Sequence, residues 1–219
     1  MLTTLTEENY LKAIYHISQY SNSGISTNAI AKKVNSKASS VTDMLKKLAD
    51  KNLITYIKYK GVNLTEEGRL KAIDIVRKHR LWEVFLVDKL NFSWDEVHDI
   101  AEQLEHIKSP KLINELDAFL DFPTHDPHGD PIPDKNGQIQ RTNKIVLSKA
   151  LVGERYTCVG VIDSSSEFLK YLDKYEIGIG TEISVEDKEA FDQSMTFKIN
   201  DRVMVMSKAI TNNMYVKKL

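Results

Sequence analysis

Apolar side chains recur at helical spacing through the first fifty residues. Leu11 and Ile14 mark the inner face of a helix for which Thr6 is placed as the cap. The same spacing predicts a second helix over residues 27–34 and a third over residues 38–51. The sequence therefore predicts three helices that are joined by short polar turns.

The hydrophobic period changes from helical to alternating at residue 53. Residues 53–59 and 62–64 are rich in β-branched and aromatic side chains, and Gly61 lies at a turn between them. They predict a β-hairpin, and a long helix follows over residues 65–90. Three helices followed by a hairpin are the order of a winged helix-turn-helix, although other small helical domains also contain a hairpin.

The rest of the chain predicts two more helices, a proline-rich loop and a small β domain. The helices cover residues 93–108 and 111–120, and residues 121–133 hold four of the five prolines. Short strands, typical of a small barrel, are predicted at residues 156–162, 182–186, 195–199 and 202–206.

Charge is distributed unevenly over three segments of the chain. Residues 1–74 carry a net charge of +4, residues 75–140 carry −6 and residues 141–219 carry +1. A basic end suits a polyanionic partner, and an acidic middle suits chemistry that needs carboxylates. We expect a mainly α chain with a small β part: a winged helix-turn-helix at residues 1–74, a helical domain at 75–140 and a β-barrel at 141–219.

Composition excludes several broad classes of protein. With 42% hydrophobic and 28% charged residues, the chain is globular rather than fibrous or disordered. A single cysteine, Cys158, excludes an intrachain disulfide and a thiolate zinc site. No apolar run approaches the roughly 18 residues that span a bilayer. We expect a cytoplasmic protein with no membrane partner.

Lysines gather around the third predicted helix and the hairpin. Such lysines can hold DNA phosphates, and the small and hydroxylated residues at the start of that helix can enter a major groove. Asp43 is unfavourable there, because a carboxylate accepts only from cytosine and is repelled by phosphate. A merely solvated face explains any one lysine better than it explains all of them. The candidate DNA-binding residues are Thr27, Lys37, Ala38, Ser39, Ser40, Thr42, Asp43, Lys46, Lys47, Lys58 and Lys60.

Histidine and glutamate recur at helical spacing in the acidic middle segment. The residues concerned are His79, Glu83, His98, Glu102, Glu105 and His106. The last four fall within about 100° of arc on one helix face. No lysine or arginine interrupts residues 90–107, whereas a solvated face in this lysine-rich chain would interleave compensating charge. Imidazole and carboxylate groups without thiolate suit a divalent metal such as Mn²⁺ or Fe²⁺.

Two other interpretations of this acidic face stay open on spacing alone. Val97, Ile100 and Leu104 occupy the opposite face, so the histidines and glutamates can form a solvated stripe on an amphipathic helix. A metallohydrolase is disfavoured because no nucleophile and base pair stands near these residues. We interpret His128 and the neighbouring Asp126 as linker structure.

The motifs of this chain resemble those of the metal-dependent repressors typified by the diphtheria toxin repressor and the manganese transport regulator. The resemblance covers nearly the whole chain, and its final seventy residues are similar to the SH3-like domain that also occurs alone in ferrous transport accessory proteins (FeoA type). The motifs that carry it are Tyr10–Tyr15, Ser39–Leu48, Leu64–Gly68, Arg77–Glu83, Val97–Asp99, Glu105–His106 and His128–Pro133.

The resemblance implies two metal positions in each subunit. One would use His79, Glu83 and His98, with a further ligand from Asp163 or Glu167 in the third domain. The other would use Glu102, Glu105, His106 and the side chain of Asn9. Family members that sense iron place sulfur ligands at the positions of Asn9 and Glu102, and the manganese sensor places acids at both. This chain follows neither pattern.

The function implied by the resemblance is metal-activated regulation of transcription. Mn²⁺ or Fe²⁺ would bind at two sites per subunit, and a homodimer would then bind a palindromic operator and repress metal-homeostasis genes. No enzymatic activity and no small-molecule substrate are expected. The alternative from a different class is a winged-helix transcription factor that responds to a non-metal effector, for which DNA binding would be indifferent to chelators.

Overall fold

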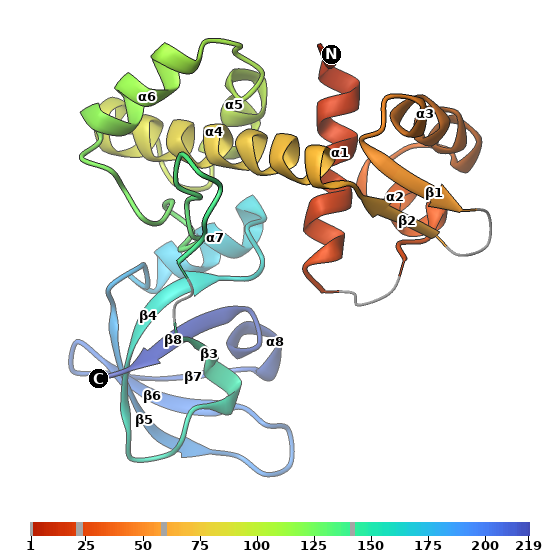
Figure 1. Cartoon of the computed structure of the whole chain (residues 1–219). Coiled ribbons are helices and arrows are strands. Elements are labelled where there is room, and N and C mark those ends of the chain that lie inside the picture. The colour runs from red at the N-terminus through yellow and green to blue at the C-terminus, as the bar shows by residue number, and fades with distance from the viewer. Residues whose placement is uncertain (1, 21–23, 58–60, 141–142) are drawn as a thin grey trace. The chain divides into compact units, whose positions relative to one another are not determined.

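A computed structural model describes residues 2–20, 24–57, 61–140 and 143–219 of the chain. These residues form two compact units. One comprises residues 1–79, 102–115 and 133–138, and the other comprises residues 80–101, 116–132 and 139–219. Within the described ranges, no helix is both long and apolar enough to cross a membrane. Figure 1 labels the elements along the chain.

The first helix, α1 (Leu5–Ser18), begins two residues earlier than predicted. Its N-cap is Thr4 and not Thr6, because Thr4 and Glu7 form a reciprocal capping box. The Thr4 hydroxyl accepts from the Glu7 backbone N–H, and the Glu7 carboxylate accepts from the Thr4 backbone N–H. This cap fixes which side chains of α1 face the remainder of the unit.

The predicted helix-turn-helix and hairpin are confirmed. Helices α2 (Thr27–Lys33) and α3 (Ala38–Asp50) precede the antiparallel strands β1 (Ile54–Ile57) and β2 (Gly61–Leu64). Apolar side chains of all these elements form one core with α1, and Val41, Leu45 and Leu48 of α3 are fully buried in it. The opposite face of α3 is left to solvent.

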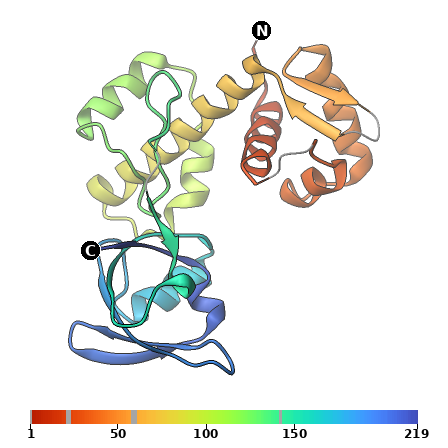
Figure 2. The same cartoon turned by 60° about the horizontal axis from the view of Figure 1, so that its bottom comes forward.

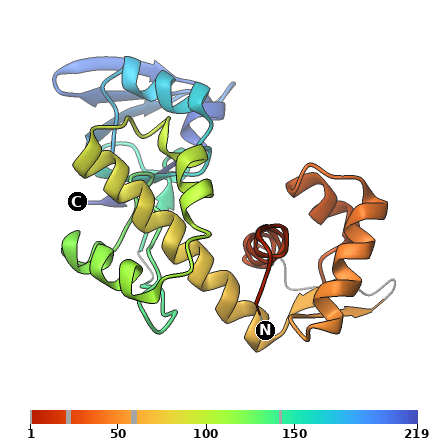
Figure 3. The ribbon, with the colours of Figure 1, turned by 90° about the horizontal axis from the view of Figure 1, so that it is seen from above.

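Three further helices follow the hairpin. The long helix α4 (Glu66–Leu90) is unbroken, as Figure 3 shows along its length. Helix α5 (Val97–Leu104) is shorter than the predicted helix over residues 93–108, because Ser93 caps a turn with Asp95 and Glu96 before it starts. Helix α6 (Pro110–Phe119) has Pro110 as its first residue.

The carboxyl-terminal part contains a six-stranded antiparallel sheet in the order β3-β8-β4-β5-β6-β7. Figure 2 shows the strands of this part, which are coloured from green to blue. The sheet and helix α7 (Ser166–Lys174) enclose one core of aliphatic and aromatic side chains. The expected fold class, helical domains followed by a small β domain, is confirmed. The strands are β3 (Ile145–Val146), β4 (Arg155–Val161), β5 (Glu182–Lys188), β6 (Met195–Ile199), β7 (Arg202–Met206) and β8 (Met214–Lys218), with a 3-10 turn η1 (Leu147–Lys149) and a short helix α8 (Lys208–Thr211).

Candidate metal and DNA-binding sites

The first unit brings α1 against the end of the acidic segment. His106 Nδ1 lies 2.6 Å from Glu8 Oε2, and the other ring nitrogen of His106 lies 3.8 Å from Glu105. Glu8 is buried and also accepts from the Thr3 hydroxyl at 2.6 Å. One imidazole therefore stands between carboxylates from two segments that are about a hundred residues apart in the chain.

Glu105 lies at the centre of this cluster and is fully buried. His79 Nδ1, from α4, lies 2.6 Å from one Glu105 oxygen. Lys12 Nζ lies 2.8 Å from a Glu105 oxygen and 3.2 Å from Glu102. We call Glu8, His79, Glu102, Glu105 and His106 the α1 cluster, and all five belong to the first unit.

The helical phase of α1 selects Glu8 for this cluster and leaves Asn9 outside it. Glu8 and Lys12 are four residues apart and share a helix face, whereas Asn9 is rotated by about 100° from Glu8. Asn9 is exposed. The structure thus places a carboxylate against His106, next to the residue that the family resemblance indicated.

The second predicted position is organised around Glu83, which is buried on α4. His98 Nδ1, on α5, lies 3.5 Å from Glu83 Oε1. His79 lies one turn before Glu83 on the same unbroken helix, so the two side chains share a face. Glu83 and His98 belong to the second unit, in which Glu83 is buried and His98 is exposed, and His79 is the last residue of this helix in the first unit.

Glu83 also belongs to a group that sequence reasoning missed. Asp126 and His128, from the proline-rich loop, are buried, and their ligand atoms and those of Glu83 all lie within 4.8 Å of one another. His128 Nδ1 lies 3.6 Å from Glu83, and its Nε2 lies 2.8 Å from the Trp94 carbonyl oxygen. A proton on Nε2 would be donated to that carbonyl and would leave Nδ1 free to bind a metal.

The electrostatics of this second group reflect two carboxylates that are buried close together. Burial, followed by the charge of Glu83, raises the pKa of Asp126 to about 7. Burial lowers the pKa of His128, but the hydrogen bond and charge of Glu83 outweigh it and raise the pKa to about 9. Arg80 Nε lies 3.4 Å from Asp126. Two buried carboxylates that crowd one another in this way are stabilised by a bound cation.

Asp163 and Glu167, the two predicted ligands from the third domain, lie in neither candidate group that the described residues form. Glu167 is exposed on α7, and Asp163 is half-buried with its carboxylate accepting from the Ser165 backbone N–H at 2.9 Å. Their assignment as ligands stays a prediction.

The donor set fits a divalent metal. The α1 cluster and the residues around Glu83 both offer imidazole nitrogen and carboxylate oxygen, and neither set contains sulfur. Several of these carboxylates are buried, which is costly for an ion without a matching charge. Oxygen and imidazole donors suit Mn²⁺ and Fe²⁺.

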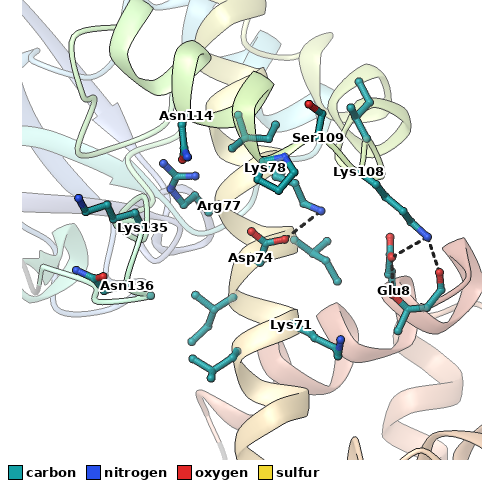
Figure 4. A pocket seen from close by; sticks show the side chains of 18 of the residues that line it. Glu8, Lys71, Asp74, Arg77, Lys78, Lys108, Ser109, Asn114, Lys135 and Asn136 are labelled. Carbon is teal, nitrogen blue, oxygen red and sulfur yellow. Dashed lines mark hydrogen bonds and ion pairs between the residues drawn. The ribbon is translucent and has the colours of Figure 1, made fainter. Parts of the chain in front are cut away.

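A cavity of about 760 Å³ in the first unit reaches one edge of the α1 cluster (Figure 4). Glu8 lines this cavity, and Lys108 Nζ lies 3.8 Å from its carboxylate. On the α4 side of the cavity, Lys78 and Asp74 form an ion pair at 3.2 Å. The cavity gives ions a route to the Glu8 carboxylate.

The predicted DNA-binding face lies on α2 and α3 of the first unit. Lys37, Ala38, Ser39 and Ser40 are exposed at the start of α3, and Lys46 and Lys47 are exposed at its end; Thr27 and Thr42 are half-buried. Exposed Asp43 lies 3.6 Å from Lys46, so the carboxylate has a local cation. The wing residues Lys58 and Lys60 lie outside the described residues.

Models of three protein families match successive parts of the chain. Residues 1–62 match the iron-dependent repressor amino-terminal DNA-binding domain, residues 65–134 match the iron-dependent repressor metal-binding and dimerisation domain, and residues 145–218 match the FeoA domain. The two repressor models together account for more than half of the chain.

Individual relatives agree with these matches. The chain is similar to the iron-dependent repressor IdeR of Mycobacterium tuberculosis, with 34% identity over 128 residues, which are 58% of this chain and 55% of that protein. The chain thus spans about half the length of the curated relatives that it matches.

Solved structures match over greater length. A manganese-dependent transcriptional repressor in complex with manganese has 32% identity and a TM-score of 0.86 over 97% of this chain and 100% of that chain. ScaR with bound Zn²⁺ has 31% identity and a TM-score of 0.77 over 97% and 99%. The chain therefore belongs to the family of iron-dependent repressors, which are metal-dependent DNA-binding regulators of transcription and not enzymes.

Proposed function

We propose that this chain represses transcription by binding operator DNA when a divalent metal occupies the α1 cluster. The observation that carries this proposal is the 2.6 Å contact between Glu8 of α1 and His106 at the end of the acidic segment. Glu8 lies on the first helix of the DNA-binding fold, and His106 lies in the segment matched by the metal-binding family model. A ligand bound by both residues ties these two parts together.

Glu8, Glu102, Glu105 and His106 would hold the ion, and His79 would orient Glu105 through its 2.6 Å contact. A bound divalent metal supplies two positive charges, which offset the repulsion among the three carboxylates. The carboxylates then hold α1 in one position relative to residues 102–108 of the same unit. Restricting α1 in this way raises the population of the DNA-binding conformation, and operator DNA tightens metal binding by the same factor.

A second ion would bind at Glu83 within the second unit, with His98 or with Asp126 and His128 as partners. Both choices share Glu83, so the proposal is one further site and not two. Because Glu8, and not Asn9, faces the α1 cluster, α1 contributes one carboxylate and Glu102 contributes another. Oxygen ligands of this kind favour Mn²⁺, with Fe²⁺ as the other candidate.

The proposed partner is a palindromic DNA site that is bound by a homodimer. Exposed Lys46 and Lys47 would contact phosphates, and Ser39 and Ser40 at the start of α3 would contact base edges. A two-fold dimer places its recognition helices about 34 Å apart, one turn of B-DNA. We place this activity in the cytoplasm because DNA is the proposed partner. The three segments 1–74, 75–140 and 141–219 would serve DNA binding, dimerisation with metal binding, and a supporting SH3-like role.

Substitution of His106 tests the proposal. His106→Ala removes the imidazole between Glu8 and Glu105, so metal-dependent DNA binding should be lost while the circular dichroism spectrum stays native. His16→Ala is the matched control, because His16 lies at the other end of α1 and should leave metal response unchanged. Metal-dependent operator binding by His106→Ala with wild-type affinity would overturn the assignment of the α1 cluster.

A further inference from the structure

Lys12 places a cation among the proposed metal ligands. It follows Glu8 by one turn on the same face of α1, and its side chain is only 11% exposed. Its ammonium lies 2.8 Å from Glu105 and 3.2 Å from Glu102. Among the lysines of the described residues, Lys12 is thus the one that contacts Glu102 and Glu105, which are two of the three carboxylates of the α1 cluster.

The contact with Glu105 occupies oxygens that a metal would need. Glu105 is fully buried and also contacts His79 at 2.6 Å, so little room is left around its carboxylate. A divalent ion that binds Glu102 and Glu105 takes the place of the ammonium between them. A metal and an ammonium held by the same oxygens would repel each other strongly in this buried setting.

Lys108 also lies near the α1 cluster, but it differs from Lys12 in its contacts and in its exposure. It lies 3.8 Å from Glu8, its side chain is 47% exposed, and it donates to the Thr3 carbonyl oxygen at 2.6 Å. Figure 4 shows this lysine on the cavity side of Glu8. Lys108 can stay in place when an ion binds, because it keeps its hydrogen bond to the Thr3 carbonyl oxygen, which is not a proposed metal ligand.

We propose that Lys12 is a tethered cation that fills the α1 cluster in the metal-free protein and must leave before a divalent metal can bind Glu102 and Glu105. Lys12 therefore sets the metal concentration at which the protein responds. It also compensates the buried carboxylates while no metal is present. The inference rests on the proposed function, because it assigns Lys12 a role toward the same metal.

Metal affinity of a Lys12 variant is the direct test. Lys12→Met keeps an unbranched side chain that is one heavy atom shorter and removes its charge. Manganese affinity of the full-length protein, measured without DNA by competition with a fluorescent chelator, should tighten by about tenfold or more, since an opposite charge at this distance shifts the proton affinity of a carboxylate by about 10- to 1,000-fold. The metal-free variant should melt at a lower temperature than the wild type.

Lys51 supplies a matched control at Glu7, which is rotated by about 100° from Glu8 on α1. Its ammonium lies 2.7 Å from Glu7, another buried glutamate of α1, and Glu7 is not among the proposed ligands. Lys51→Met should lower the melting temperature in the same way and leave manganese affinity unchanged. Comparing the two variants separates loss of an ion pair from loss of a competitor.

A second measurement uses the wild-type chain and does not depend on the folding of a variant. Acetylation by N-hydroxysuccinimide acetate, followed by mass spectrometry, should label Lys12 slowly without metal and several-fold faster with Mn²⁺. Labelling of Lys51 should not change. A release of Lys12 by manganese is a result that a purely structural lysine would not give.

The outcomes distinguish the inference from the proposed function. Wild-type protein that binds manganese with the same affinity as Lys12→Met, or Lys12 labelling that is indifferent to manganese, overturns the inference alone. Weaker binding by folded Lys12→Met also overturns it, because Lys12 would then position the glutamates for the metal. Wild-type protein that binds neither Mn²⁺ nor Fe²⁺ overturns the proposed function and the inference with it.

Discussion

Glu8 and Asn9 give opposite predictions for two neighbouring substitutions. Glu8→Gln keeps the size of a side chain that is buried and lies 2.6 Å from His106, and it removes one of the three carboxylates of the α1 cluster. Asn9→Ala changes a side chain that is exposed on the same helix. Only the first substitution should weaken metal binding.

The magnitude follows from the charge that is removed. Coulomb's law gives about 4 kcal/mol for two unit charges 4 Å apart at an effective dielectric constant of about 20. Much of this is offset, because Gln keeps one oxygen ligand and the empty site no longer confines a third negative charge. Changes to groups that merely orient metal ligands already cost about 10- to 100-fold in affinity. We therefore expect the manganese dissociation constant to rise about 100-fold, or about 2.8 kcal/mol, for Glu8→Gln.

Isothermal titration calorimetry of the purified, metal-free variants with Mn²⁺ measures this difference. Asn9→Ala should match the wild type within about twofold, or about 0.4 kcal/mol. Equal losses of manganese affinity in the two variants would contradict the conclusion that Glu8, and not Asn9, faces the α1 cluster. Wild-type affinity in Glu8→Gln would show that Glu8 is not a ligand.

Three further predictions concern stability and DNA binding. Burial raises the pKa of Glu7, but the hydrogen bonds from Lys51 and Thr4, together with the charge of Lys51, outweigh it and hold the pKa below its ordinary value of 4.5. The destabilisation by Lys51→Met in urea titrations should therefore be full above pH 4.5 and shrink as the pH falls below it. A persistent difference at pH 2 would contradict this. Gly68→Ala should cost about 2 kcal/mol or more, because a Cβ there would lie 1.9 Å from the Leu53 carbonyl oxygen, whereas Gly178→Ala has open space and should be mild in the same titration. Lys47→Gln should lower the salt dependence of DNA affinity, measured by fluorescence anisotropy, by about one unit of slope, and an unchanged slope would remove Lys47 from the interface.

Periodicity located the helices and the hairpin because their apolar faces are encoded locally. Leu45 and Leu48 of α3, for example, recur at helical spacing and are both fully buried. The predicted start of α1 is two residues late, since both Thr4 and Thr6 are good caps and only the pairing of Thr4 with Glu7 decides between them. That choice concerns single hydrogen bonds, which a hydrophobic pattern does not contain.

In the candidate sites too, local spacing predicts some of the residues and does not predict others. The spacing of Glu105 and His106 within one segment was visible in the sequence, and the structure brings both into the α1 cluster. The choice of Glu8 over Asn9 depends on helical phase, which a resemblance to related motifs does not fix. His128 joins Glu83 only through the path of a proline-rich loop, 45 residues further along the chain, so no local pattern could predict the contact.

Fluorescence anisotropy shows whether metal controls DNA binding. The purified protein is titrated onto a labelled DNA fragment from upstream of a metal-uptake gene, in chelator, in Mn²⁺ and in anaerobic Fe²⁺. We predict salt-sensitive binding in the presence of metal and a loss of at least about tenfold in affinity in chelator, which corresponds to about 1.4 kcal/mol of coupling. Equal affinity in chelator and in both metals would contradict it.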